Sequence, residues 1–108
     1  MRRINKTIEL FEQGQPAYII DTQELTYEAG HNLAQTWADI IVIDFEHHAF
    51  DTVGLTKFMR GLKDGGPTPS GHPTPTVITT LPSNCISREE VIYNAWQARH
   101  VLSTGVHG

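Results

Sequence analysis

The hydrophobic positions along the chain switch between helical spacing and short continuous runs. From residue 3 to residue 13, apolar side chains recur every three or four positions, and Gly14 follows where a left-handed C-cap is favoured. A brief apolar run rich in β-formers at residues 16–20 then predicts a buried strand, which ends at the polar residues 21–24. The chain is thus expected to begin with a short helix and a first strand.

The next two elements have clear and different patterns. An apolar residue recurs at every fourth position from Leu25 to Trp37, which predicts an amphipathic helix whose stripe packs against a sheet, despite Gly30 in its middle. Residues 39–45 contain a continuous apolar run, residues 40–43, between Asp39 and Asp44. Such a run is typical of a parallel strand covered on both faces. This run is the strongest strand signal in the sequence.

A third helix and a long loop follow. Asp51 can cap a helix whose apolar stripe continues to Leu62 and ends at a Gly-Gly-Pro sequence. Residues 65–75 contain four of the six prolines and are expected to form an extended connection rather than a domain linker, because only 33 residues come after it (108 − 75 = 33).

The last predicted strand and helix are well delimited. Residues 76–81 form an apolar and β-branched run that Pro82 ends. Ser87 and Glu90 give the S-x-x-E pattern of a capping box, and an apolar stripe follows over residues 91–102, in which Trp96 is expected to pack. The order α-β-α-β-α-β-α predicts one α/β domain over residues 1–108, with a parallel sheet and right-handed crossovers.

Composition restricts the range of functions. The formal net charge is -4 at pH 7 and no basic face is evident, so nucleic acid is not expected as a partner. No run of 18 apolar residues predicts a membrane span, and the N-terminus lacks the apolar core of a secretory signal. The single cysteine, Cys85, fits a reducing compartment and is expected to be an incidental thiol. The sequence therefore indicates a cytoplasmic protein.

Charged side chains gather where the second predicted strand ends. Two carboxylates and two imidazoles occupy five positions there: Asp44, Glu46, His47 and His48. Loops after the carboxyl ends of parallel strands collect the functional groups of α/β proteins, and charge at such a place is costly unless it is paired or used. One interpretation is a solvated turn with an Asp–His hydrogen bond. The other is an acid–base pair in which a carboxylate orients His47.

The segment that carries these residues resembles a family motif. Residues 37–47 are similar to the hydrophobic run with a closing D-x-E-H box that ends the second strand in the HpcH/HpaI aldolases, which are related to citrate lyase β-like enzymes. The leading helix, the Gly-x-Pro turn at residues 14–16, the strand ending in Leu81-Pro82 and the closing residues 103–108 follow in the family's order. The resemblance covers nearly the whole chain.

The resemblance implies a metal-dependent carbon–carbon lyase. Members of this family are TIM (β/α)8 barrels that bind a divalent metal, usually Mg²⁺ or Mn²⁺, and use it to hold pyruvate as its enolate. They cleave or form 4-hydroxy-2-oxo acids, so the implied partner is a small 2-oxo acid, and full-length relatives are homo-oligomers.

Carried over onto this sequence, the motif implies roles for individual residues. His47 would be the acid–base residue, Asp44 would hydrogen-bond the metal–water network, and Glu46 would be a positioning carboxylate around the metal site. The family's substrate-binding arginine corresponds to Thr80, which can donate one hydrogen bond but carries no charge. His48 lies outside the motif and is expected to be a loop histidine.

The family's metal ligands come from later strands. The chain reaches Gly108 where a fourth strand would begin, so it is expected to be the N-terminal three and a half β/α units of the barrel, without a metal site or aldolase activity of its own. The spacing of the other histidines, His31, His72, His100 and His107, predicts no metal site either. Two alternatives stay open: a non-catalytic small α/β interaction domain, and a chain that needs self-association or a missing C-terminal half for stability.

Overall fold

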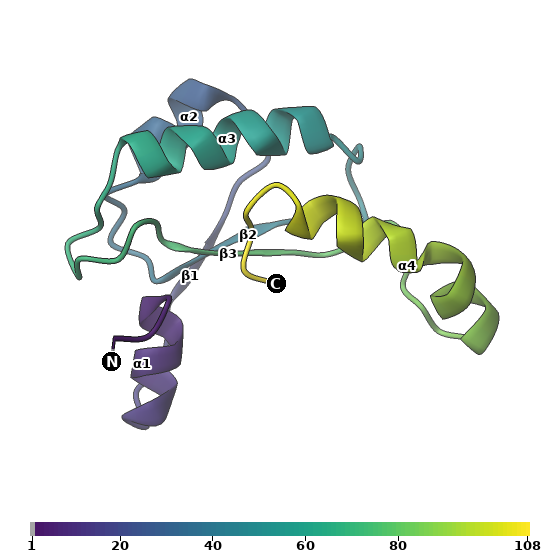
Figure 1. The fold of residues 1–108 in the computed structure, drawn as a ribbon, viewed down its shortest axis with the longest axis horizontal. Helices are drawn as coiled ribbons and strands as arrows, with labels where there is room; N and C mark the ends of the chain where they lie inside the picture. Colours follow the sequence, from purple (N-terminus) through teal and green to yellow (C-terminus); the bar gives the residue numbers. More distant parts are fainter. Residues whose placement is uncertain (1) are drawn as a thin grey trace.

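The computed structural model describes residues 2–108 and shows an α/β fold in which helices and strands alternate (Figure 1). Its elements are α1 (Lys6–Glu12), β1 (Ile19–Asp21), α2 (Tyr27–Leu33), β2 (Ile40–Ile43), α3 (Thr52–Asp64), β3 (Thr76–Thr79) and α4 (Arg88–Leu102). The predicted order of elements and the α/β class are confirmed. Within residues 2–108, no helix combines the length and the apolar character that crossing a membrane requires.

The sheet is parallel, with the strand order β1-β2-β3. The last residues of the chain run alongside β3. The His107 backbone N donates to the Val77 carbonyl oxygen at 2.8 Å, and the Thr79 backbone N donates to the Gly108 carbonyl oxygen at 2.8 Å. Residues 106–108 therefore lie where a fourth strand would pair with β3.

The two faces of the sheet have different surroundings. Ile41, Ile43 and Val77 are fully buried in one cluster with Phe58 of α3. Figure 1 shows α2 and α3 side by side on this side of the sheet, with α1 on the other side. Side chains alternate along a strand, so Ile40, the neighbour of Ile41, points to the second face. Ile19 pairs with Ile40 and lies on the same face, where it is 57% exposed. The main core thus lies between the sheet and α3.

Two glycines allow α2 and α3 to cross closely. A Cβ atom on Gly30 would lie 2.0 Å from the Phe58 carbonyl oxygen, and one on Gly61 would lie 2.1 Å from the Tyr27 carbonyl oxygen. Any side chain at either position would therefore separate the helices. This contact explains why a glycine stands in the middle of α2, where its helix propensity is poor.

Helix α1 is held at the amino ends of β2 and β3. The Thr7 and Thr76 Oγ1 atoms are 2.8 Å apart and buried. Lys6 Nζ lies 2.8 Å from an oxygen of Asp39, whose carboxylate also accepts a hydrogen bond from the Tyr18 backbone N at 2.9 Å. These polar contacts fix the helix at the amino ends of the strands, opposite to their carboxyl ends.

The predicted helix starts are confirmed in part. Asp51 accepts a hydrogen bond from the Gly54 backbone N at 2.8 Å, and Ser87 accepts one from the Glu90 backbone N at 3.1 Å. The Glu90 carboxylate accepts from the Ile86 backbone N at 3.3 Å instead of from that of Ser87. Only one half of the predicted capping box therefore forms.

Three packing predictions were wrong. The first strand, expected to be buried, is the edge strand β1, in which Ile19 and Asp21 are exposed. Trp37 was expected on a helical stripe, but α2 ends at Leu33 and Trp37 is 73% exposed. A spacing of four residues drifts by about 40° per step around a 3.6-residue helix, so this stripe could not stay on one face.

The buried face of α4 also differs from the predicted stripe. Val91, Trp96 and Leu102 are about half-exposed, whereas Gln97 and Val101 are buried. Gln97 Oε1 accepts a hydrogen bond from the Ser83 backbone N at 3.1 Å, which turns this polar side chain towards the body of the protein. The face of α4 that packs inward therefore carries Gln97 and Val101 and not the predicted stripe.

Candidate functional site

Asp44 forms a turn directly after β2. Its Oδ1 atom accepts hydrogen bonds from the backbone N of Glu46 at 2.9 Å and of His47 at 3.2 Å. An aspartate that accepts from amides two and three residues further on closes an Asx turn. The D-x-E-H segment therefore folds back on its aspartate and keeps His47 beside it.

Thr80 extends this network from the neighbouring strand. Its hydroxyl donates to Asp44 Oδ1 at 2.7 Å and accepts from the backbone N of Phe45 at 3.0 Å and of Glu46 at 3.2 Å. Asp44 and Thr80 follow two residues after Val42 and Ile78, which pair with each other, so both side chains lie on the second face of the sheet. The substrate contact expected of Thr80 stays a prediction, but the structure uses its hydroxyl to position Asp44.

The Asp44 and His47 side chains form a dyad. His47 Nδ1 lies 2.8 Å from Asp44 Oδ2. The Thr80 hydrogen bond, followed by that of His47, holds the pKa of Asp44 far below its usual value. The hydrogen bond and charge of Asp44, with the charge of Glu46, raise the pKa of His47. Since Nδ1 faces the carboxylate, Nε2 is the nitrogen that can exchange a proton with a ligand.

The other two charged residues lie close to this dyad. Glu46 Oε1 is 3.9 Å from His47 Nε2, and His48 Nδ1 is 3.8 Å from Asp44 Oδ2. These distances exceed a hydrogen bond and permit only a charge interaction. The structure therefore brings together Asp44, Glu46 and His47 of the motif with Thr80, and it adds His48, whose i+4 spacing from Asp44 was the available signal.

The residues of this cluster do not fit a metal site by themselves. Within residues 2–108, no group of three or more His, Cys, Asp or Glu side chains is arranged to hold an ion. Both oxygens of Asp44 already accept hydrogen bonds, from Thr80 and His47 among others. Mg²⁺ needs several oxygen ligands in near-octahedral geometry, which Glu46 alone cannot provide.

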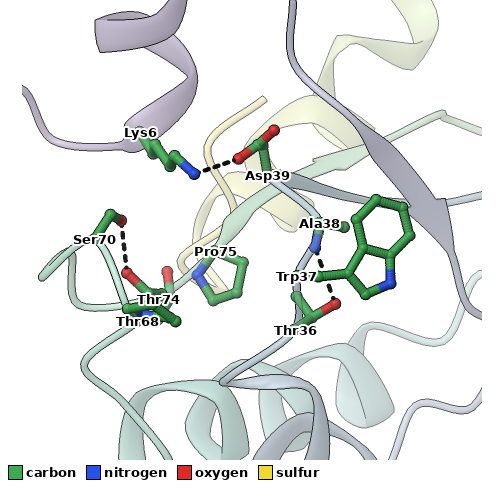
Figure 2. Close-up of a pocket in the computed structure, with 10 residues that line it drawn as sticks. Lys6, Thr36, Trp37, Ala38, Asp39, Thr68, Ser70, Thr74 and Pro75 are labelled. Atoms are coloured by element: carbon green, nitrogen blue, oxygen red, sulfur yellow. Dashed lines mark hydrogen bonds and ion pairs between the residues drawn. The ribbon is translucent and has the colours of Figure 1, made fainter.

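A second polar cluster, which sequence reasoning did not find, lies at the amino ends of the strands. A cavity of about 140 Å³ lies there. Figure 2 shows the Lys6–Asp39 ion pair on one side of it and the side chains of Thr68 and Ser70 on another. The exposed Trp37 also lines it. These residues come from α1, the segment before β2 and the proline-rich loop, so no local motif could indicate the cavity.

Comparison with known proteins adds no relative: no family model, no curated protein and no solved structure matches the chain. The resemblance to the HpcH/HpaI aldolases therefore stays a prediction that rests on the D-x-E-H segment and on the order of the other matching segments. The function has to be argued from the geometry of the two clusters.

Proposed function

We propose that the chain provides the proton-transfer part of an aldolase-type site for 4-hydroxy-2-oxo acids, as in the HpcH/HpaI lyases. The observation that carries this proposal is the 2.8 Å contact between His47 Nδ1 and Asp44 Oδ2 at the carboxyl end of the central strand. A carboxylate on Nδ1 fixes the tautomer and strengthens Nε2 as a base. The His47 side chain is 70% exposed, so a ligand can reach it.

The arrangement of the elements supports a barrel as the setting of this site. Parallel strands in sequential order place their connecting helices on one side of the sheet, as in a (β/α)8 barrel. Residues 106–108 continue that order beside β3. Asp44 and Thr80 lie at the carboxyl end of the sheet, on the face that points away from α2 and α3. In a barrel, this face would line the inside.

The proposed step is a retro-aldol cleavage. His47 Nε2 takes the proton of the 4-hydroxyl group, and the C3–C4 bond breaks to release an aldehyde. The electrons of that bond form the enolate of pyruvate, and His47 Nε2 returns the proton to its C3 atom. Asp44 stabilises the imidazolium that His47 becomes, and Thr80 holds Asp44 in place. The divalent metal that the resemblance implies would need ligands other than the residues described here.

Exchange of the C3 protons of pyruvate tests the proposal, because it needs enolate formation but no complete aldol cleavage. Proton NMR in D2O, with and without Mg²⁺, should show exchange in the wild-type chain that is at least about tenfold faster than in His47→Gln, since general bases contribute about 10²- to 10⁴-fold at full efficiency. His31→Gln, at an exposed position of α2, is the matched control and should keep the wild-type rate. Equal rates in the wild type and His47→Gln would contradict the proposal.

A non-catalytic interaction domain is the second candidate function. The observation in its favour is the apolar outer surface of α4, where Tyr93 is 75% exposed and Ile92 and Trp96 lie nearby in sequence with exposed side chains. Exposed apolar groups of this kind often mark contact sites. This function predicts that Tyr93→Ser changes association with a binding protein, while His47→Gln has no effect on any measured activity.

A further inference from the structure

Three side chains from two distant segments form a hydrogen-bonded series at the amino end of the sheet. The Ser70 Oγ and His72 Nδ1 atoms are 2.8 Å apart, and His72 Nε2 lies 3.1 Å from Glu9 Oε1. His72 is 2% exposed, so both nitrogens of its ring need partners inside the protein. The series therefore runs from a hydroxyl, through a buried imidazole, to a carboxylate on α1.

The surrounding hydrogen bonds indicate where the protons lie. Thr68 Oγ1 accepts from the His72 backbone N at 3.2 Å and lies 2.9 Å from Ser70 Oγ. If Thr68 gives its hydroxyl proton to Ser70, the proton of Ser70 is directed at His72 Nδ1, and Nε2–H is directed at Glu9. This pattern leaves His72 as the acceptor for the serine proton, which is the arrangement that activates a nucleophilic serine.

The serine also borders a space for a ligand. Ser70 and Thr68 line the cavity of about 140 Å³, and Figure 2 shows their hydroxyls beside it, with the Lys6 ammonium group near them. A cavity of about 150 Å³ holds a benzene-sized molecule, so the space here admits a short acyl chain. Lys6 and Asp39, whose charged groups are 2.8 Å apart, line the cavity as an ion pair.

We propose that Ser70, His72 and Glu9 form a nucleophilic triad that hydrolyses short-chain carboxylic esters. Ser70 Oγ attacks the ester carbonyl carbon while its proton passes to His72 Nδ1, and Glu9 stabilises the resulting imidazolium through Nε2–H. The C–O bond to the alcohol breaks, and the alcohol leaves with the proton from His72. Water then attacks the acyl-serine in the same way and releases the carboxylic acid and free Ser70. This activity is independent of the Asp44–His47 dyad.

Glu9 is the member whose environment supports a charged state. Burial alone would raise the pKa of Glu9, but the pKa is lowered, with contributions from the hydrogen bond of His72 and from the charge of Arg2. Arg2 Nε lies 3.4 Å from the same Oε1 atom, and Arg2 also donates to the Ser70 carbonyl oxygen. Arg2 thus ties the carboxylate to the loop that carries the serine.

A fluorophosphonate probe tests the triad, because it labels serines that an adjacent base activates. Incubation of the full chain, followed by intact mass and peptide mapping, should place one label on Ser70. Ser70→Ala should lose the label, and Glu9→Gln should reduce the labelling rate at least about tenfold, within the range that a positioned acid–base partner provides. Ser103→Ala, on the last turn after α4, is the control and should be labelled like the wild type.

Two further measurements keep the test decisive. Far-UV circular dichroism identifies any variant that fails to fold, and His72→Gln is judged only if it folds, since its ring is buried. Hydrolysis of p-nitrophenyl acetate should exceed that of the octanoate, because the cavity excludes a long chain. Absence of the label from Ser70 in the folded wild type, or equal labelling rates in the wild type and folded Glu9→Gln, would overturn the proposal.

Discussion

The two ends of the sheet carry polar side chains for different physical reasons. At the amino end, Asp39, His72 and Thr76 are no more than 6% exposed and bond to α1 or the proline-rich loop. At the carboxyl end, His47 bonds to Asp44 three residues before it and its side chain is 70% exposed. Buried polar groups must be paired to avoid a large desolvation cost, whereas exposed ones can use water. The amino-end contacts therefore hold segments together, and the carboxyl-end dyad leaves a nitrogen free.

This difference predicts different effects on stability at the two ends of the sheet. Loss of a partner at the amino end leaves a buried polar group unpaired, which lowers the free energy of unfolding. Loss of a partner at the carboxyl end is compensated by solvent and should alter pKa values more than stability. Substitutions at the two ends can thus show whether the contrast holds.

The largest effect is expected for Asp39→Ala. The substitution removes a buried carboxylate that accepts from Lys6 and from the Tyr18 backbone N. The free energy of unfolding should fall by about 2–4 kcal/mol, slightly below the usual cost of breaking a buried ion pair because Lys6 is partly exposed. Urea denaturation at neutral pH measures it. Asp21→Ala, which removes an exposed carboxylate, is the control and should change the value by about 0.5 kcal/mol or less.

The same carboxylate gives a pH test of this result. Burial raises the pKa of Asp39, but the contacts with Lys6 and Tyr18 lower it by a larger amount. The pKa of Asp39 is therefore lower in the folded state than in the unfolded state. Its contribution is present above the unfolded pKa and is lost as the pH falls through the folded pKa. The difference between wild type and Asp39→Ala should therefore shrink in acid. A difference that stays constant with pH would contradict the assignment.

A smaller effect is expected for Thr80→Val at the carboxyl end. The substitution removes the hydrogen bond that lowers the pKa of Asp44 most, so that pKa should rise, and the free energy of unfolding should fall by less than in Asp39→Ala. NMR titration of the Asp44 carboxyl carbon and urea denaturation measure the two changes.

Thr79, the residue before Thr80, provides a matched control in which the free energy of unfolding should not fall. Within residues 2–108, Thr79 Oγ1 is the buried side-chain atom without a hydrogen-bond partner. Thr79→Val should therefore leave stability unchanged or raise it, because an unsatisfied hydroxyl is replaced by a methyl group of similar shape. If both valine variants are destabilised equally, the Thr80 contact with Asp44 makes no specific contribution.

Sequence reasoning predicted the carboxyl-end site because its information is local. Asp44, Glu46 and His47 follow one strong strand signal, and adjacent parallel strands bring their carboxyl ends together, which placed Thr80 beside them. The amino-end cluster was not predictable in this way. Its contacts join residues such as Glu9 and His72, 63 positions apart, and no periodicity in either segment indicates the other.

Packing on α4 was mispredicted for a related reason. The apolar stripe gave a plausible buried face, but Gln97 is buried instead, through its bond to the Ser83 backbone N. A hydropathy pattern predicts that a polar residue is exposed, because it does not include the tertiary hydrogen bonds that can stabilise a buried one. The elements that were predicted well, β2 and α3, are those in which the apolar pattern coincides with the buried face.

The smallest expected effect concerns two histidines whose pKa values shift in opposite directions. The hydrogen bond and charge of Asp44 raise the pKa of His47 above the ordinary value of 6.5. Its stabilising contribution is therefore fully present below pH 6.5 and is lost as the pH rises through the folded-state pKa. Burial lowers the pKa of His107, whose Nδ1 accepts a hydrogen bond from the Val77 backbone N at 3.0 Å. That contribution is present above pH 6.5 and is lost as the pH falls through the folded-state pKa.

Unfolding free energies measured from about pH 5 to 8, the range in which histidines titrate, separate the two contributions. Relative to wild type, His47→Gln should lose stability mainly at the acid end of the range, and His107→Gln mainly at the alkaline end. The His47 difference should be the smaller of the two, because that side chain is exposed to solvent, which screens its attraction to Asp44. If His47→Gln instead lost most stability at the alkaline end, the imidazole would be neutral in the folded protein, and Asp44 would not stabilise its charged form.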